Sequence, residues 1–146
     1  PVVKQGLFCY DGLMSEKIIK QLKKIFAGFK QVKLAYVFGS QANGTAGPLS
    51  DYDFAVYLSE KDSAKRFDIR LNLMSQLSLL LKTDAVDVVV INDTESPDLK
   101  YNIVKEGKLI LKKQPYKILI EPQIINEYFD FNLSLFKNNL TKQAYV

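Results

Sequence analysis

Hydrophobic residues recur along this chain at two spacings, and each spacing predicts a different kind of element. In 15–29 the apolar residues return every three or four positions, the period of an amphipathic helix with Ser15 as its N-cap. A longer helix is predicted at 63–81, with an apolar face formed by Ala64, Phe67, Leu71, Met74, Leu77 and Leu81. Short apolar runs rich in β-branched and aromatic residues predict buried strands at 32–38, 52–58 and 85–91.

The next part of the chain predicts one more helix and one more strand. Pro97 opens and Gly107 stops a short helix at 97–106, and a last, short strand is predicted at 109–111. Strands that alternate with helices favour an α/β fold, in which helices pack against a sheet.

The pattern changes after Lys117, where aromatic residues become frequent. We predict a C-terminal helix at 118–140, broken or begun near Pro122. The chain then divides into a domain at 1–115 and a C-terminal helical extension at 116–146, which packs on that domain or on a partner protein.

Size and composition are those of a single globular domain. The chain has 146 residues, of which 47% are hydrophobic and 25% charged, so it can bury a core without disulfides. The lone cysteine, Cys9, favours a reducing compartment. No apolar run approaches the roughly 18 residues that span a membrane, and the first residues lack the pattern of a signal peptide. We therefore expect a cytoplasmic protein without a membrane partner.

Charge and residue usage narrow the possible chemistry. The net charge of +4 suits a phosphate-bearing substrate or an acidic partner, without demonstrating either. The lysines between 100 and 117 are expected to form a solvated surface, so we expect no direct binding of nucleic acid. Histidine is absent, which excludes a Ser-His-Asp triad, a Cys-His pair and a His-ligated zinc site. Catalysis must then use carboxylates, hydroxyls, backbone amides and Lys or Arg.

The candidate chemistry lies between the first two predicted strands. The first strand runs into Gly39-Ser40, and after a gap of ten residues Asp51 and Asp53 stand at the head of the second strand. Gly39 lets the backbone approach a ligand and Ser40 adds a hydroxyl, so this turn can face a phosphate. Asp51 and Asp53 are two apart on a strand, so their carboxylates point to one face and can share hard cations such as Mg²⁺. A pair of such ions stabilises the attacking and the leaving oxygen in phosphoryl transfer.

Asp87 interrupts the third predicted strand, which otherwise consists almost entirely of Val and Ile. A carboxylate inside such a strand is unfavourable unless it is paired, protonated or bound to a metal. If this strand lies beside that of Asp51 and Asp53, three carboxylates converge. Asp87 could then be a third metal ligand, the base that takes a proton from the attacking hydroxyl, or both.

Gly39-Ser40, the ten-residue gap and Asp51-x-Asp53 resemble the signature of the DNA polymerase β-like nucleotidyltransferases. The residues around it, 46–56, are similar to the minimal nucleotidyltransferases and, within these, to MntA-type antitoxins, which are paired with HEPN-domain RNase toxins. The resemblance covers roughly 15–111. It implies a small mixed β-sheet packed against helices, as in the palm domain of polymerase β.

The resemblance also implies an activity and a partner. The expected reaction is an ATP-dependent transfer of AMP onto a tyrosine of a HEPN toxin, which silences the toxin and releases pyrophosphate. In that picture Asp51 and Asp53 hold Mg²⁺, with two ions expected, and Asp87 is the third ligand or the base. Gly39 and Ser40 bind the triphosphate. The toxin is then the expected partner, in a hetero-oligomer.

The chain departs from this family pattern in the loop after Ser40. Many relatives carry Arg at the positions of Gln41 or Asn43, and this chain has Arg at neither. Lys65 and Arg66, early in the long helix, are the nucleotide-binding candidates that could replace that charge, and Arg70 is a further one.

Two other functions stay open. One is an antitoxin that blocks its toxin by contact alone. The other is a transferase acting on a small molecule, as in the aminoglycoside nucleotidyltransferases, which usually carry an additional substrate-binding domain. Substituting Asp51 and Asp53 by Asn separates contact from catalysis, because a contact inhibitor would still neutralise the toxin.

Overall fold

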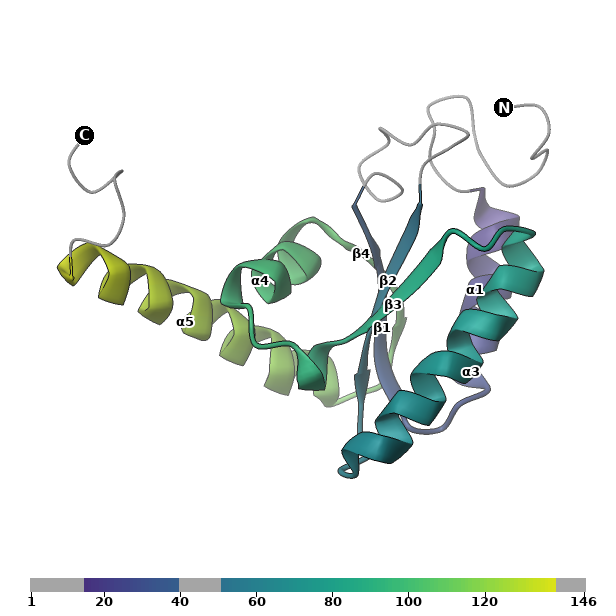
Figure 1. Ribbon diagram of the computed structural model, residues 1–146, viewed down its shortest axis with the longest axis horizontal. Helices are drawn as coiled ribbons and strands as arrows, with labels where there is room; N and C mark the ends of the chain where they lie inside the picture. The colour runs from purple at the N-terminus through teal and green to yellow at the C-terminus, as the bar shows by residue number, and fades with distance from the viewer. Residues whose placement is uncertain (1–14, 40–50, 139–146) are drawn as a thin grey trace.

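The computed structural model describes residues 15–39 and 51–138 (Figure 1). The elements in chain order are α1 (Glu16–Ala27), β1 (Val32–Phe38), β2 (Tyr52–Leu58), α3 (Ser63–Leu81), β3 (Val86–Val90), the short 3-10 helix η2 (Ile91–Asp93), α4 (Pro97–Glu106), β4 (Lys108–Lys112) and α5 (Tyr116–Lys137). Every helix and strand predicted from the sequence is present, which confirms the α/β class.

The described strands form one sheet in the order β3-β2-β1-β4. β1 runs antiparallel to both β2 and β4, whereas β2 and β3 are parallel and are joined by the crossover helix α3. This small mixed sheet confirms the prediction. The pairing also brings the start of β2, the start of β3 and the end of β1 to the same end of the sheet.

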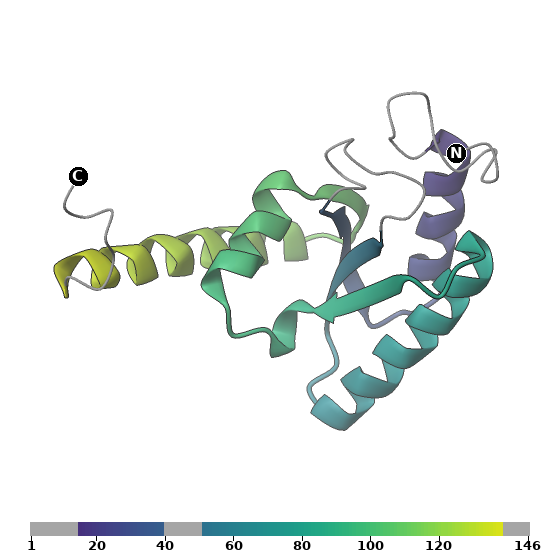
Figure 2. The same ribbon diagram turned by 45° about the horizontal axis from the view of Figure 1, so that its top comes forward.

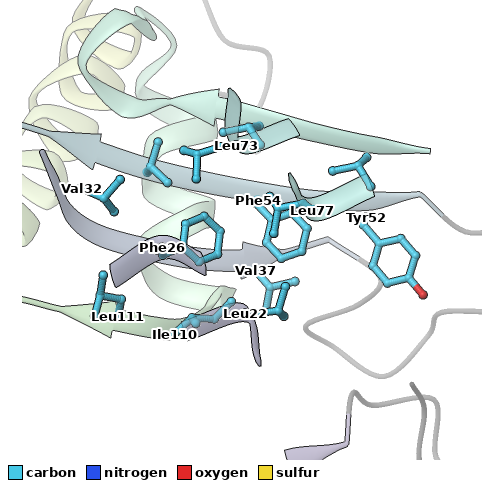
Figure 3. Close-up of a cluster of buried hydrophobic side chains, with 14 of the residues drawn as sticks. Leu22, Phe26, Val32, Val37, Tyr52, Phe54, Leu73, Leu77, Ile110 and Leu111 are labelled. Carbon is cyan, nitrogen blue, oxygen red and sulfur yellow. The ribbon is translucent and has the colours of Figure 1, made fainter. Parts of the chain in front are cut away.

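Helices cover both faces of the sheet (Figures 1 and 2). α1 and α3 pack on one face, where the rings of Phe26 and Phe54 lie 5.8 Å apart at the centre of the larger core cluster (Figure 3). α4 and the first turns of α5 pack on the opposite face. The buried residues there are Leu34, Tyr36, Ala55, Ile91, Ile103 and Ile124.

Three helices begin at side-chain caps that the sequence contains. The Ser15 hydroxyl accepts a hydrogen bond from the Ile18 amide, which confirms Ser15 as the N-cap of α1. Asp62 caps α3 in the same way, and Ser96 caps α4, whose first residue is Pro97. These caps satisfy amides at each helix start, so the starts of α1, α3 and α4 are determined locally.

The buried face of α3 differs from the predicted one. The helix buries Ile69, Leu73, Leu77 and Leu81, a row at four-residue spacing, whereas Phe67 and Leu71 are exposed. Apolar residues occur on most sides of α3, so its own periodicity does not select a face. Packing against the sheet decides which row of α3 is buried.

The C-terminal part of α5 extends away from the rest of the domain (Figures 1 and 2). Its first turns are tied to the domain, because the Tyr36 hydroxyl donates to the Glu121 carboxylate at 2.5 Å and Lys100 pairs with Glu127 at 2.7 Å. The Tyr101 and Tyr128 rings stack at 3.9 Å. Beyond that point the large apolar side chains Phe129, Leu133 and Phe136 are more than half exposed.

The prediction that α5 is broken or begun near Pro122 is wrong, since the helix begins at Tyr116 and continues through the proline. Pro122 is exposed, so its ring lies where water can satisfy the backbone carbonyl that lost its amide partner. Among the described residues, no helix combines the length and the apolar character needed to cross a bilayer.

Candidate active site

Three adjacent strands bring the predicted site residues together at one end of the sheet. Gly39 follows the end of β1, Asp51 immediately precedes β2, Asp53 is the second residue of β2, and Asp87 is the second residue of β3. Ser40, predicted to bind phosphate, lies outside the described residues, as do Gln41 and Asn43. The geometry of the site therefore rests on one glycine and three carboxylates.

Asp53 and Asp87 are direct neighbours across the parallel pairing of β2 and β3. Their Cα atoms are register partners, and the Tyr52 amide donates to the Ala85 carbonyl at 2.8 Å beside them. Adjacent strands are about 4.8 Å apart, and both residues point to the face that carries the buried Ala55. This pairing confirms the condition of the prediction, that the strand of Asp87 lies beside the strand of Asp53.

The three carboxylates repel one another. The pKa of Asp53 is raised above its ordinary value of 3.8, first by burial and then by the negative charges of Asp87 and Asp51. Asp51 itself is exposed to solvent. A cation placed among these groups would offset both the repulsion and the loss of hydration. Oxygen donors at this density therefore fit a hard divalent ion such as Mg²⁺.

The side chains are not gathered into a finished metal site. Among the described residues, no three acidic or thiol side chains converge closely enough to hold an ion as they lie. Asp87 instead accepts a hydrogen bond from Arg70 of α3, with Nη2 and Oδ1 3.0 Å apart. Metal binding by Asp51, Asp53 and Asp87 stays a prediction, and it requires their carboxylates to turn toward one another.

Gly39 lies against the carboxylate of Asp53. Its φ is +72°, in the left-handed region that favours glycine, and a Cβ at this position would lie 3.0 Å from the Asp53 Oδ2 atom. From the sequence we expected the glycine to admit a phosphate. In the structure it also makes room for the central carboxylate of the site.

The basic residues of α3 that were considered for nucleotide binding differ in what they contact. Arg66 donates to Asp93 and to the backbone carbonyls of Glu60 and Lys61, and Lys65 is exposed. These contacts do not test the predicted role of Lys65 and Arg66 in nucleotide binding. Arg70 contacts one of the three carboxylates, Asp87, and its Nε atom also donates to the Val88 carbonyl at 2.6 Å.

A groove begins at this contact and was not anticipated from the sequence. It runs between α3 and the outer edge of β3, has a volume of about 380 Å³, and carries the exposed ring of Phe67 on its wall. We had assigned Phe67 to the buried face of α3. The sequence does contain a signal that Phe67 faces solvent. Its neighbours on the same side of the helix are polar, with Ser63 four residues before it and Arg70 three residues after it.

Comparison with known families identifies the domain. The family described as Polymerase beta, Nucleotidyltransferase matches residues 20–116, which include Gly39 and all three carboxylates. No curated protein sequence matches the chain.

Several solved structures share the fold. A chain from the structure of a toxin–antitoxin with AMP-PNP is 26% identical, with a TM-score of 0.67, over 80% of this chain and 91% of its own. A chain from a mutant of the toxin–antitoxin MntA-HpeT is 25% identical, with a TM-score of 0.65, over 84% and 93%. A chain from the complex of a tri-AMPylated Shewanella oneidensis HEPN toxin with its MNT antitoxin is 23% identical, with a TM-score of 0.59, over 84% and 92%, a likeness of fold alone.

The family match spans about two thirds of the chain and contains the paired carboxylates, and the fold is similar to that of these structures. The chain belongs to the polymerase β nucleotidyltransferase family.

Proposed function

We propose that this chain is a cytoplasmic antitoxin that transfers AMP from ATP to a tyrosine of a HEPN RNase toxin in a Mg²⁺-dependent reaction and thereby silences it. The observation that carries the proposal is the pairing of Asp53 with Asp87 on adjacent parallel strands, beside Asp51. The pKa of the central carboxylate, Asp53, is raised by burial and by its two acidic neighbours. Such a group of carboxylates suits a cation with a triphosphate rather than an anionic ligand alone.

The similar structures support the nucleotide and the partner. One contains AMP-PNP, an ATP analogue, and those compared are toxin–antitoxin assemblies. Another contains a toxin that carries three AMP groups. The exposed apolar side chains of α5 give this chain a surface that a partner protein can cover.

The proposed reaction is a single displacement at the α-phosphorus of ATP. A bond forms between the tyrosine oxygen and the α-phosphorus, and the bond to the bridging oxygen of the β-phosphate breaks, so that pyrophosphate leaves with the electron pair. The phenolic proton passes to the Asp87 carboxylate. Asp51 and Asp53, with Asp87 as a further ligand, would hold Mg²⁺, which would supply positive charge to stabilise the triphosphate and the leaving group. Gly39 leaves the space in which Asp53 keeps its position.

Inhibition by contact alone is the second candidate, and the exposed half of α5 is the observation that favours it. A contact inhibitor needs the α5 surface and does not need the carboxylates. The two functions therefore respond differently to substitution of the carboxylates.

The test uses the purified chain, its cognate HEPN toxin, ATP and Mg²⁺, followed by intact mass spectrometry of the toxin and an RNase assay. We expect the toxin to gain one or more AMP units and to lose RNase activity. The Asp51→Asn and Asp53→Asn variants should form the complex without modifying the toxin, and EDTA should prevent modification by the unaltered chain.

A matched control is Asp68→Asn, which removes an exposed carboxylate of α3 that neither belongs to the site nor lines the groove. It should transfer AMP at the rate of the unaltered chain. An unmodified toxin that is nevertheless inhibited, by the unaltered chain and by both Asn variants alike, would establish contact inhibition and reject the transfer.

A further inference from the structure

We infer that the groove between α3 and the outer edge of β3 is the binding site for the acceptor side chain, an aromatic hydroxyl presented by the partner protein. The inference rests on the proposed function, because it names where the acceptor of that reaction binds. It adds a binding site and a contact residue, Phe67, to the carboxylates already described.

The order of the strands indicates on which side the acceptor approaches. Gly39 belongs to the end of β1, Asp53 to β2 and Asp87 to the edge strand β3, so these residues follow one another across the sheet. In a displacement at phosphorus the attacking and leaving oxygens lie roughly in line. If the triphosphate lies on the glycine side, the attacking hydroxyl must come from the opposite side, where β3 is the outermost strand.

The groove begins at that side of the site. Asp87 and Arg70 line one end, and the edge from Val88 to Val90 forms the floor. Phe67 stands on the wall with 53% of its surface exposed. An aromatic ring in the groove can pack against Phe67 and the valines while its hydroxyl reaches Asp87, the group that accepts the proton.

Two carbonyls on the edge of β3 already accept hydrogen bonds within the protein. The Val88 carbonyl accepts from Arg70, and the Val90 carbonyl accepts from the Thr94 hydroxyl at 3.1 Å. A partner segment that paired with β3 as an added strand would have to share or displace these hydrogen bonds. The groove offers contact with side chains, which suits the insertion of a single residue.

Arg70 has a fixed position in this arrangement. It binds one oxygen of Asp87 and a carbonyl of the same strand, which holds the carboxylate at the end of the groove. An acceptor that fills the groove thus meets the Asp87 carboxylate at one end. The exposed ring of Phe67 is the part of the groove that can be changed without touching this contact.

The test is steady-state AMP transfer to the cognate toxin by Phe67→Ala, with toxin and ATP varied separately. We expect the KM for the toxin to rise by roughly tenfold, the upper end of what one aromatic pair contributes, with the KM for ATP unchanged. Phe67→Tyr, which keeps the ring, should stay close to the unaltered chain. Leu79→Ala is the matched control, since Leu79 lies on the same helix, is 80% exposed and does not line the groove.

Each outcome decides the inference. If the unaltered chain transfers AMP and Phe67→Ala has an unchanged KM for the toxin, the acceptor does not bind in this groove. A rise in the KM for ATP alone assigns the groove to the nucleobase and also rejects the inference. An equal loss in Phe67→Ala and Leu79→Ala, with lowered melting temperatures, shows a structural effect of α3 and rejects it as well. If the unaltered chain transfers no AMP at all, the proposed function fails and the inference fails with it.

Discussion

Replacing Gly39 by alanine separates the stability of this fold from its chemistry. The backbone at Gly39 has a φ of +72°, and the added Cβ would approach the Asp53 Oδ2 atom to 3.0 Å. The contact is with the end of a side chain, which can swing away. The backbone angle cannot relax in this way without moving the end of β1.

The two effects have different sizes. An alanine in the left-handed region costs about 1–2 kcal/mol. For a chain of this length that free energy lowers the melting temperature by roughly 2–8 °C. Displacement of the Asp53 carboxylate costs more in rate, because a shift of about 1 Å in a catalytic group can lower turnover by about 100-fold. We therefore expect a folded protein, slightly less stable, with about one hundredth of the AMP transfer.

The measurements are thermal unfolding followed by circular dichroism and AMP transfer at saturating ATP. Gly28→Ala is the control. At Gly28 φ is −68°, an ordinary angle for alanine, and the closest contact of an added Cβ is the Ile25 carbonyl oxygen at 3.3 Å. Full activity in Gly39→Ala, at any melting temperature, would refute the claim that this glycine keeps Asp53 in place.

Two further predictions concern ionisable groups. The pKa of Asp53 is raised above 3.8, so the folded state favours the neutral carboxyl group. As pH rises above that value the group becomes charged, and the free energy of unfolding falls. Asp53→Asn should therefore raise the melting temperature at pH 7 in EDTA but not below about pH 4. Thermal scans over a series of pH values check this, and a lower melting temperature of the variant at pH 7 would contradict it. Burial and the neighbouring Glu121 raise the pKa of Tyr36 above its ordinary 10.0, so ionisation of Tyr36 lowers the stability of the fold as pH rises above that value. Tyr36→Phe should remove the hydrogen bond to Glu121 and lower the free energy of unfolding at pH 7 by about 1.5–3 kcal/mol. Urea denaturation measures this change. A change within the error of the measurement would show that the hydrogen bond adds no stability.

The elements were predictable from the sequence because their signals are local. Runs of β-branched and aromatic residues predicted β1, β2 and β3, and Ser15 marked the start of α1. The spacing of Gly39 and the Asp51-x-Asp53 motif predicted which residues share one end of the sheet. These features depend on residue type and on short spacing alone.

What could not be predicted depends on contacts between distant residues. The register that sets Asp53 opposite Asp87 depends on the pairing of β2 with β3, two strands that are separated along the chain by α3. The outward position of Phe67 is decided by the row of α3 that fits the sheet. The contact between Arg70 and Asp87 joins residues 17 positions apart, so the sequence named both residues without connecting them.

α5 consists of two halves that depend differently on the rest of the protein. Its first turns share hydrogen bonds and stacked rings with the domain, whereas the turns from Phe129 onward bury little against it. Short helices in water are marginal without packing, so the outer turns open with a lower free energy than the domain, and proteases and exchanging solvent reach them first. A partner that covers these turns would prolong the life of the chain by mass action. The lifetime of the protein and the occupancy of its partner would then be linked through one helix.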